Sequence, residues 1–97
     1  MDQRLFVWAC IEPKPEHFDD ARDAIASIVS PTRKEAGCYR FDLLCGEGDG
    51  CLYLYEEWTD ESALAEHYAQ AYTRTVFEKY KEWLAKPVEI KRLRALS

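Results

Sequence analysis

Long apolar runs are what this sequence most clearly lacks. A membrane-spanning helix needs about 18 to 20 consecutive apolar residues, and no segment of the chain approaches that length. Residues 1–4 lead directly into a short apolar segment, without the pattern of a secretory signal peptide. We therefore predict a cytoplasmic protein with no membrane insertion. A chain of 97 residues is expected to form a single domain, residues 1–97, with a small core.

Clustered metal ligands and basic stretches are also scarce. The cysteines include no C-x-x-C pair, and the two histidines do not complete a zinc-site spacing. We predict no metal site, and reduced core thiols rather than a disulfide between Cys45 and Cys51, which flank a tight turn. The net charge of −5 repels polyanions, which argues against nucleic acid as a partner.

Apolar residues, in contrast, are plentiful and alternate in the manner of β-strands. Residues 4–12 and 51–58 are apolar or aromatic on both faces, which predicts two central strands. Residues 38–45 alternate apolar with charged side chains, and the segment that Pro87 begins mixes charges with Val88 and Ile90. These patterns predict two edge strands buried on one face.

Two further segments have the spacing of amphipathic helices. The first begins at Pro15, is expected to be interrupted at Ser30-Pro31, and is followed by a turn up to Ala36. Gly37 then stands where a left-handed C-terminal cap is expected. The second segment begins after residues 59–62 and extends to Leu84, with a phase shift near Gln70.

The predicted order βαββαβ fits an α+β, ferredoxin-like fold with an antiparallel sheet. Two helices can cover one face of such a sheet. The other face would present a large patch of aromatic and aliphatic side chains from the central strands, larger than soluble monomers usually expose. We therefore predict a homodimer in which two sheets pack face to face.

Several short motifs resemble the antibiotic biosynthesis monooxygenase family. They are Thr32-Arg33-x-Glu35-x-Gly37-Cys38, Phe41-Asp42-Leu43, Tyr55-Glu56-x-Trp58 and Leu64-x-x-His67. The resemblance extends from Phe6 to Leu96 and implies a dimeric α+β barrel. It also implies a pocket between sheet and helices with Trp58 in its wall. The family includes oxygenases of quinols and polycyclic phenols that use no metal or flavin, haem-degrading members, and a branch that processes a phosphorylated autoinducer sugar.

This sequence departs from each branch at specific positions. Leu54 and Leu64 stand where the polyketide oxygenases have polar groups. Phe77 stands where the haem-degrading branch has its histidine, so an axial iron ligand is missing. Gln70-Ala71-Tyr72 replaces the Ser/Thr-Pro-His that often follows the helix histidine in quinol-oxygenase-like and autoinducer-processing members.

His67 and Glu56 are the candidate catalytic residues. Imidazole exchanges protons near neutrality, and the parity of Glu56 with Trp58 points its carboxylate toward the helices, where it could orient His67. Equally open are a buried histidine satisfied by a carbonyl or carboxylate, and an ion pair of Glu56 with Arg33 or Arg94. The predicted pocket lining is aromatic and aliphatic: Trp58, Phe41, Tyr39, Tyr72, Phe77, Leu54 and Leu64.

Together with the family resemblance, these residues predict a monooxygenase that oxidises a small aromatic or quinol substrate with dioxygen. No cofactor is expected, because the substrate anion itself would be the reductant. Two alternatives stay open. One is an isomerase or degrading enzyme for a small phosphorylated carbonyl compound, anchored by Arg33, Arg92 or Arg94. The other is a non-catalytic dimeric module that binds a small molecule.

Overall fold

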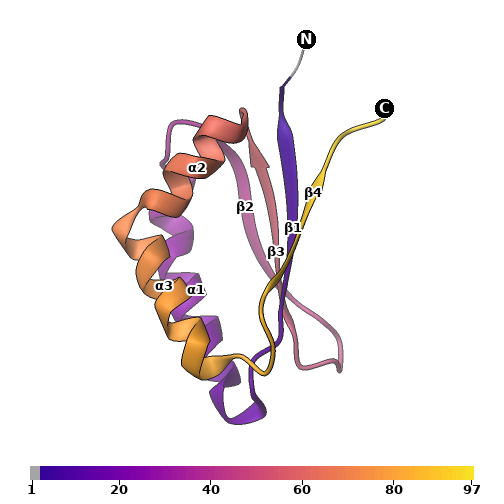
Figure 1. Ribbon diagram of the computed structural model, residues 1–97. Helices are drawn as coiled ribbons and strands as arrows, with labels where there is room; N and C mark the ends of the chain where they lie inside the picture. The colour runs from indigo at the N-terminus through magenta and orange to yellow at the C-terminus, as the bar shows by residue number, and fades with distance from the viewer. Residues whose placement is uncertain (1–2) are drawn as a thin grey trace.

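A computed structural model describes residues 3–97 as one antiparallel sheet with helices on one face (Figure 1). The elements in chain order are β1 (Leu5–Ile11), the short 3-10 turn η1 (Pro15–His17), α1 (Phe18–Arg33), β2 (Cys38–Cys45), β3 (Leu52–Trp58), α2 (Glu61–Ala69), α3 (Ala71–Trp83) and β4 (Glu89–Leu93). The strand order is β2-β3-β1-β4. The prediction of a ferredoxin-like α+β fold with two central and two edge strands is confirmed. The expectation that both edge strands are buried on one face is wrong for β4, because all five of its residues are exposed.

The two central strands hold the core together. β1 and β3 pair so that Leu5 lies opposite Trp58 and Val7 lies opposite Glu56. Alternate residues of both strands face the helices and are buried, whereas the residues between them are only partly buried. Because side chains alternate across a strand, this register brings Trp58 and Glu56 under the helices.

A β-bulge changes the expected pattern of β2. The register with β3 shifts between Cys38 and Arg40, so Tyr39 is an extra residue without a partner on β3. The extra residue leaves Phe41 opposite Glu56 and buried, but puts Tyr39 on the other side of the sheet, 53% exposed. The guanidinium of Arg4 lies 4.0 Å from the centre of the Tyr39 ring. The prediction that Tyr39 lines the pocket is therefore wrong.

The first helix continues through Pro31, contrary to the sequence-based expectation of an interruption at Ser30-Pro31. The missing N–H of Pro31 deprives only the Ser27 carbonyl of a helical partner, and Ser27 is exposed to water. The helix ends two residues later at Arg33.

Gly37 also differs from its predicted role as a left-handed cap. The glycines with positive φ are Gly48 and Gly50, in the β2–β3 hairpin. Gly37 instead permits a close approach to α2, because a Cβ at this position would lie 2.3 Å from Cβ of Ala63 and 2.9 Å from Oγ1 of Thr59.

The second helical segment is divided at Gln70. This residue has φ −65° and ψ 141°, an extended conformation that ends α2 and begins α3 in a new direction. The phase shift predicted near Gln70 is therefore a break between two helices. The Asp60 carboxylate caps α2 by accepting a hydrogen bond of 2.9 Å from the N–H of Ala63.

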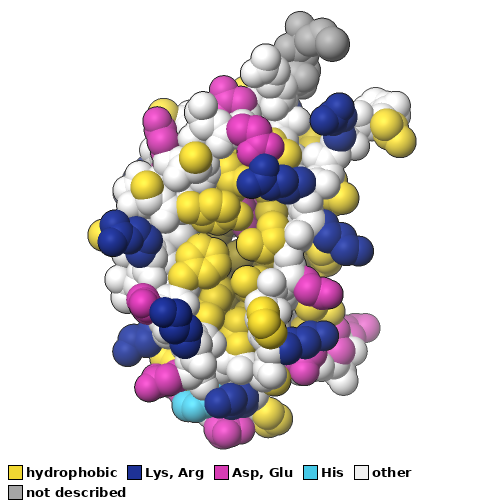
Figure 2. Space-filling model, in the orientation of Figure 1, with side chains coloured by type: hydrophobic (Ala, Val, Ile, Leu, Met, Phe, Trp, Pro, Cys, Tyr) yellow, Lys and Arg dark blue, Asp and Glu magenta, His cyan; other side chains and the backbone are white. Residues whose placement is uncertain are grey.

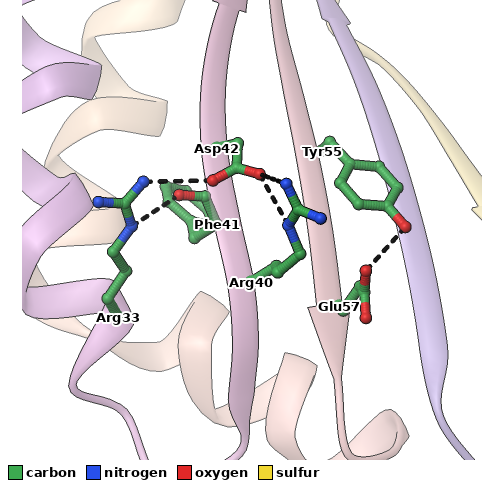
Figure 3. Close-up of polar contacts among 6 residues, drawn as sticks. All are labelled: Arg33, Arg40, Phe41, Asp42, Tyr55 and Glu57. Carbon is green, nitrogen blue, oxygen red and sulfur yellow. Dashed lines mark hydrogen bonds and ion pairs between the residues drawn. The ribbon is translucent and has the colours of Figure 1, made fainter.

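The opposite face of the sheet, which we call the outer face, has no helix over it (Figure 1). Its aromatic residues Phe6, Trp8, Tyr53 and Tyr55 are only partly buried. Polar contacts lie along β2 and β3 on this face. Asp42 accepts hydrogen bonds from Arg33 and Arg40, and the Tyr55 hydroxyl donates to Glu57 (Figure 3).

The four cysteines are free. The prediction of core thiols holds for Cys51, which is buried, whereas Cys10 and Cys38 are only partly buried and Cys45 is exposed. Within residues 3–97, no helix combines the length and the apolar character needed to cross a bilayer.

Candidate active site

A small cavity lies between the sheet and helices α1, α2 and α3. It has a volume of about 30 Å³ and is lined mainly by apolar side chains, together with Glu56, His67 and Thr73. Figure 2 shows hydrophobic side chains gathered in the hollow between helices and strands, with charged side chains around its rim. A space of this size holds about one or two water molecules, so a larger ligand requires movement of the surrounding side chains.

Glu56 places a carboxyl group in this apolar setting. The residue is 4% exposed, and one carboxyl oxygen accepts a hydrogen bond of 2.9 Å from the indole N–H of Trp58. Burial raises the pKa of Glu56 to about 7, helped by the negative charge of Glu35 and opposed by the bond from Trp58. Glu56 is thus an acid that can exchange protons near neutral pH.

The alternative left open for Glu56, an ion pair with Arg33 or Arg94, does not form. Arg33 donates instead to the carbonyl oxygen of Phe41, at 3.1 Å, and to the Asp42 carboxylate, at 3.2 Å (Figure 3). Arg94 lies beyond the end of β4 and is exposed. The cavity residues include no lysine or arginine among the described part of the chain.

His67 lies on α2, and aromatic rings surround its imidazole. It is 3% exposed, and its ring centre lies 4.8 Å from that of Trp58 and 5.4 Å from that of Phe41. Its Nδ1 lies 2.9 Å from Oε2 of Glu35, so Glu35 rather than the expected Glu56 orients the imidazole. A carboxylate accepts hydrogen bonds, so Nδ1 is the donor in this contact, and Nε2 is the ring nitrogen that can accept a proton from a ligand.

A second donor fixes Glu35. The hydroxyl of Tyr72 donates to the same oxygen, Oε2, that contacts His67. Burial, followed by the hydrogen bond to Glu35, raises the pKa of Tyr72 to about 12, so this hydroxyl remains a donor at neutral pH. Three residues from the α1–β2 connection, α2 and α3 thereby form one polar network.

The structure brings most of the sequence-predicted residues together. Five of them line the cavity: His67, Glu56, Phe41, Leu54 and Phe77. Trp58 and Leu64 are buried in the core beside it, at 0% and 1% exposure. Tyr72 acts through Glu35, and Tyr39 lies on the opposite side of the sheet.

Sequence reasoning missed Glu35, Thr73 and Tyr68 as parts of the site. Glu35 stands within the motif Thr32-Arg33-x-Glu35, but the expected interruption of α1 gave no reason to direct its carboxylate toward α2. Thr73 and Tyr68 line the cavity from the two sides of the Gln70 break. Helical spacing, counted separately before and after the phase shift near Gln70, could have indicated that both residues face the sheet.

No group of three or more histidine, cysteine, aspartate or glutamate side chains within residues 3–97 is arranged to hold a metal ion. The groups brought together in the site are suited to proton transfer. An imidazole paired with a carboxylate and a carboxyl group with a pKa of about 7 lie on one apolar cavity.

Two known proteins are similar to this chain over most of its length. The chain is 30% identical over 91 residues to "Uncharacterized protein sll1783" of Synechocystis, covering 93% of this chain and 62% of the relative, so it spans less than two thirds of that protein. It is 29% identical over 90 residues to "Putative monooxygenase Rv0793" of Mycobacterium tuberculosis, covering 93% of this chain and 89% of the relative.

Solved structures extend the similarity to the whole fold. The structure of Rv0793 matches with a TM-score of 0.93 over 97% of this chain and 96% of that chain, at 29% identity. The structure of PA3566 from Pseudomonas aeruginosa matches with a TM-score of 0.93 over 100% of this chain and 98% of that chain, at 28% identity. The model of the antibiotic biosynthesis monooxygenase family matches residues 4–83, which include β1 to β3, all the helices and the cavity residues Glu56, His67 and Thr73. With its motifs, its fold and this match in agreement, the chain belongs to the antibiotic biosynthesis monooxygenase family.

Proposed function

We propose that this protein is a monooxygenase that oxidises a quinol or phenolic small molecule with dioxygen. The observation that supports the proposal best is the buried Glu35–His67 pair beside an apolar cavity. Such a pair provides a base where the walls exclude water, which is the setting that an oxidisable phenol requires. The family and the name of the mycobacterial relative support oxygenase chemistry at a coarser level.

The first step is removal of a hydroxyl proton by Nε2 of His67. Glu35 stabilises the imidazolium that forms, because its carboxylate accepts the hydrogen bond from Nδ1. The phenolate is a better electron donor than the phenol, and the apolar walls leave it poorly solvated. The substrate then supplies the electrons that reduce dioxygen.

Two balanced outcomes follow for a quinol. In monooxygenation, one oxygen atom adds to a ring carbon and the other leaves as water, so a hydroxyquinone forms and dioxygen takes up four electrons. In simple oxidation, the quinol loses two electrons and two protons to dioxygen, so a quinone and hydrogen peroxide form. Release of oxygen on addition of catalase distinguishes the second outcome from the first.

Ligand entry requires rearrangement of the cavity mouth. An apolar cavity of about 150 Å³ binds benzene, whereas this cavity has about 30 Å³. The Phe77 ring is only partly buried and also lines two surface hollows, one along α3 and one beside residues 84–88. Rotation of Phe77, which contacts Tyr68 edge to face at 5.8 Å, would join the cavity to these hollows.

The phosphorylated-substrate alternative has less support. It needs a cationic anchor, but Arg33 bonds Asp42, and Arg92 pairs with Glu61 near the start of α2. The cavity lining provides no cation within residues 3–97.

We also propose that the active form is a homodimer joined through the outer face of the sheet. Trp8 and Tyr53 stack there with ring centres 5.3 Å apart, and Leu44 and Leu93 are 46% and 44% exposed. A second copy of the same face is a suitable cover for such an apolar patch.

The function is tested by oxygen uptake with hydroquinone, using protein treated with a chelator. We expect wild-type protein to accelerate uptake, and His67→Ala to abolish the acceleration. His17→Ala is the matched control, because His17 is the other histidine and pairs with Asp20 on the surface. Circular dichroism of each variant verifies folding. Equal rates for wild type and His67→Ala would remove His67 from the mechanism, and ligand binding without turnover would favour the binding-module alternative.

A further inference from the structure

Thr73 has a buried hydroxyl that the protein leaves unsatisfied. The residue is 3% exposed, it lines the same cavity as Glu56 and His67, and its Oγ1 has no hydrogen-bond partner within residues 3–97. Buried polar groups normally have partners, and an unsatisfied one destabilises the folded state. An apolar side chain of similar shape would avoid this cost.

The break at Gln70 explains why Thr73 has no partner on its own helix. A threonine within a helix can bond the carbonyl four residues earlier, as Thr75 does with the carbonyl of Ala71 at 3.0 Å. The corresponding residue for Thr73 is Ala69, which belongs to α2. Because the chain turns at Gln70, the Ala69 carbonyl is not in line with α3.

The polar groups of the cavity come from different elements. Glu56 lies on β3 and His67 on α2, whereas Thr73 lies at the beginning of α3. A ligand within the cavity can therefore meet a proton-exchanging group on one side and a hydroxyl on another. The hydroxyl of threonine both donates and accepts, so it suits a ligand hydroxyl or carbonyl oxygen.

We propose that Thr73 is a ligand-binding residue whose hydroxyl bonds a second oxygen function of the substrate, so that the site selects rings with two oxygen groups over rings with one. This inference rests on the proposed function for the identity of the first oxygen group, the hydroxyl that His67 deprotonates. Thr73 determines specificity and takes no part in proton removal.

The experiment compares the binding of hydroquinone and phenol to wild-type protein and to Thr73→Val. Binding is measured by calorimetry under nitrogen, so that no turnover occurs. Wild-type protein should bind hydroquinone about five-fold more tightly than phenol, the advantage of one hydrogen bond. Thr73→Val should lose this preference by weakening hydroquinone binding, while phenol binding stays within two-fold.

Thermal unfolding without ligand provides an independent readout. Removal of the unsatisfied hydroxyl should raise the melting temperature of Thr73→Val by about 5 °C. Thr75→Val, which alters an exposed hydroxyl that has a partner on the same helix, should leave the preference for hydroquinone unchanged.

Each result bears on the inference separately from the proposed function. A more stable Thr73→Val that retains the wild-type preference would overturn the ligand role and leave Thr73 a structural residue. Equal binding of the two probes by wild-type protein, or no binding of either, would also overturn it. Loss of preference in the variant without oxygen uptake by the wild type would retain Thr73 as a binding residue and reject the oxygenase.

Discussion

Oε2 of Glu35 lies 2.9 Å from Nδ1 of His67, although the two residues are 32 positions apart in the chain. The contact joins the turn after α1 to the inner face of α2. Because the carboxylate accepts the hydrogen bond from Nδ1, Nε2 is the ring nitrogen that can accept a proton from a ligand. The proposed proton transfer depends on this orientation.

We expect Glu35→Gln to lower the rate of oxygen uptake on the order of ten-fold or more. The amide oxygen of glutamine can still accept a hydrogen bond from Nδ1, but it carries no charge to stabilise the imidazolium. The measurement is kcat with hydroquinone in an oxygen electrode.

Tyr72→Phe is the control for this change. It removes the other hydrogen bond to Oε2 of Glu35 while the Glu35–His67 contact stays in place. Stability should fall by about 1 kcal/mol, with kcat within about three-fold of wild type, the range of an indirect effect. An equal loss of activity in the two variants would indicate that the network, rather than the charge on Glu35, is what matters.

Glu56→Gln should change the pH dependence of stability. The pKa of Glu56 is about 7 in the folded protein against an ordinary value of 4.5, so the folded state binds more protons than the unfolded state between these values. Wild-type stability should therefore fall as pH rises from 4.5 to 7, by roughly 3 kcal/mol relative to Glu56→Gln.

Urea unfolding of both proteins at pH 4 and pH 8 measures this difference. Glu78→Gln is the matched control, because the Glu78 side chain is 64% exposed and pairs with Lys81 on the surface. Parallel stability curves for wild type and Glu56→Gln would show that Glu56 has an ordinary pKa.

Much of the fold could be predicted because hydrophobic patterns are local. Alternation on both faces identified β1 and β3 as central strands, and helical spacing revealed a phase shift at the Gln70 break. The bulge at Tyr39 could not be predicted from the local pattern, because the extra residue in β2 depends on how β2 pairs with β3. The predicted interruption of α1 at Pro31 was wrong, because a proline this close to the end of a helix removes only one hydrogen bond. The carbonyl that loses its partner is exposed, so water can bond it.

The candidate site was only half predictable for a related reason. Parity placed Glu56 under the helices, and helical spacing turned His67 inward. The partner of His67 depended on where α1 ends relative to α2, which is a tertiary relationship. Sequence alone offered Glu56 as a neighbouring carboxylate, whereas the fold supplies Glu35.

Gly37→Ala should destabilise the protein by roughly 1–3 kcal/mol, the usual cost of overpacking. The new methyl group would overlap Cβ of Ala63 at 2.3 Å. Since Ala63 and His67 lie on the same helix, displacement of α2 should also lower activity.

A second substitution, at Ala63, tests whether the clash causes the loss of stability. Ala63→Gly in the Gly37→Ala background removes the overlapping atom and should restore part of the lost stability. Gly48→Ala meets open space and should cost only about 1 kcal/mol for its positive φ. Failure of Ala63→Gly to rescue Gly37→Ala would show that the clash is not the cause.

Trp8→Lys should dissociate the proposed dimer. It places a charge at the centre of the outer face, beside Tyr53, where a partner sheet would bury it without a counter-ion. Sedimentation equilibrium should give a mass near the 11.3 kDa of one chain. Leu96→Lys, at a position that is 99% exposed, should leave the dimer intact. A wild-type mass equal to one chain would contradict the proposal directly.

The unpaired position of Tyr39 has a consequence for comparing family members. Because this residue has no partner on β3, a chain shorter by one residue here could still keep Cys38 opposite Trp58 and Phe41 opposite Glu56. Sequence alignments that forbid a gap at this point would slide β2 by one place and match inward-pointing residues with outward-pointing ones. Homologues are best superposed on β3 first, with a single-residue deletion tolerated between Gly37 and Phe41.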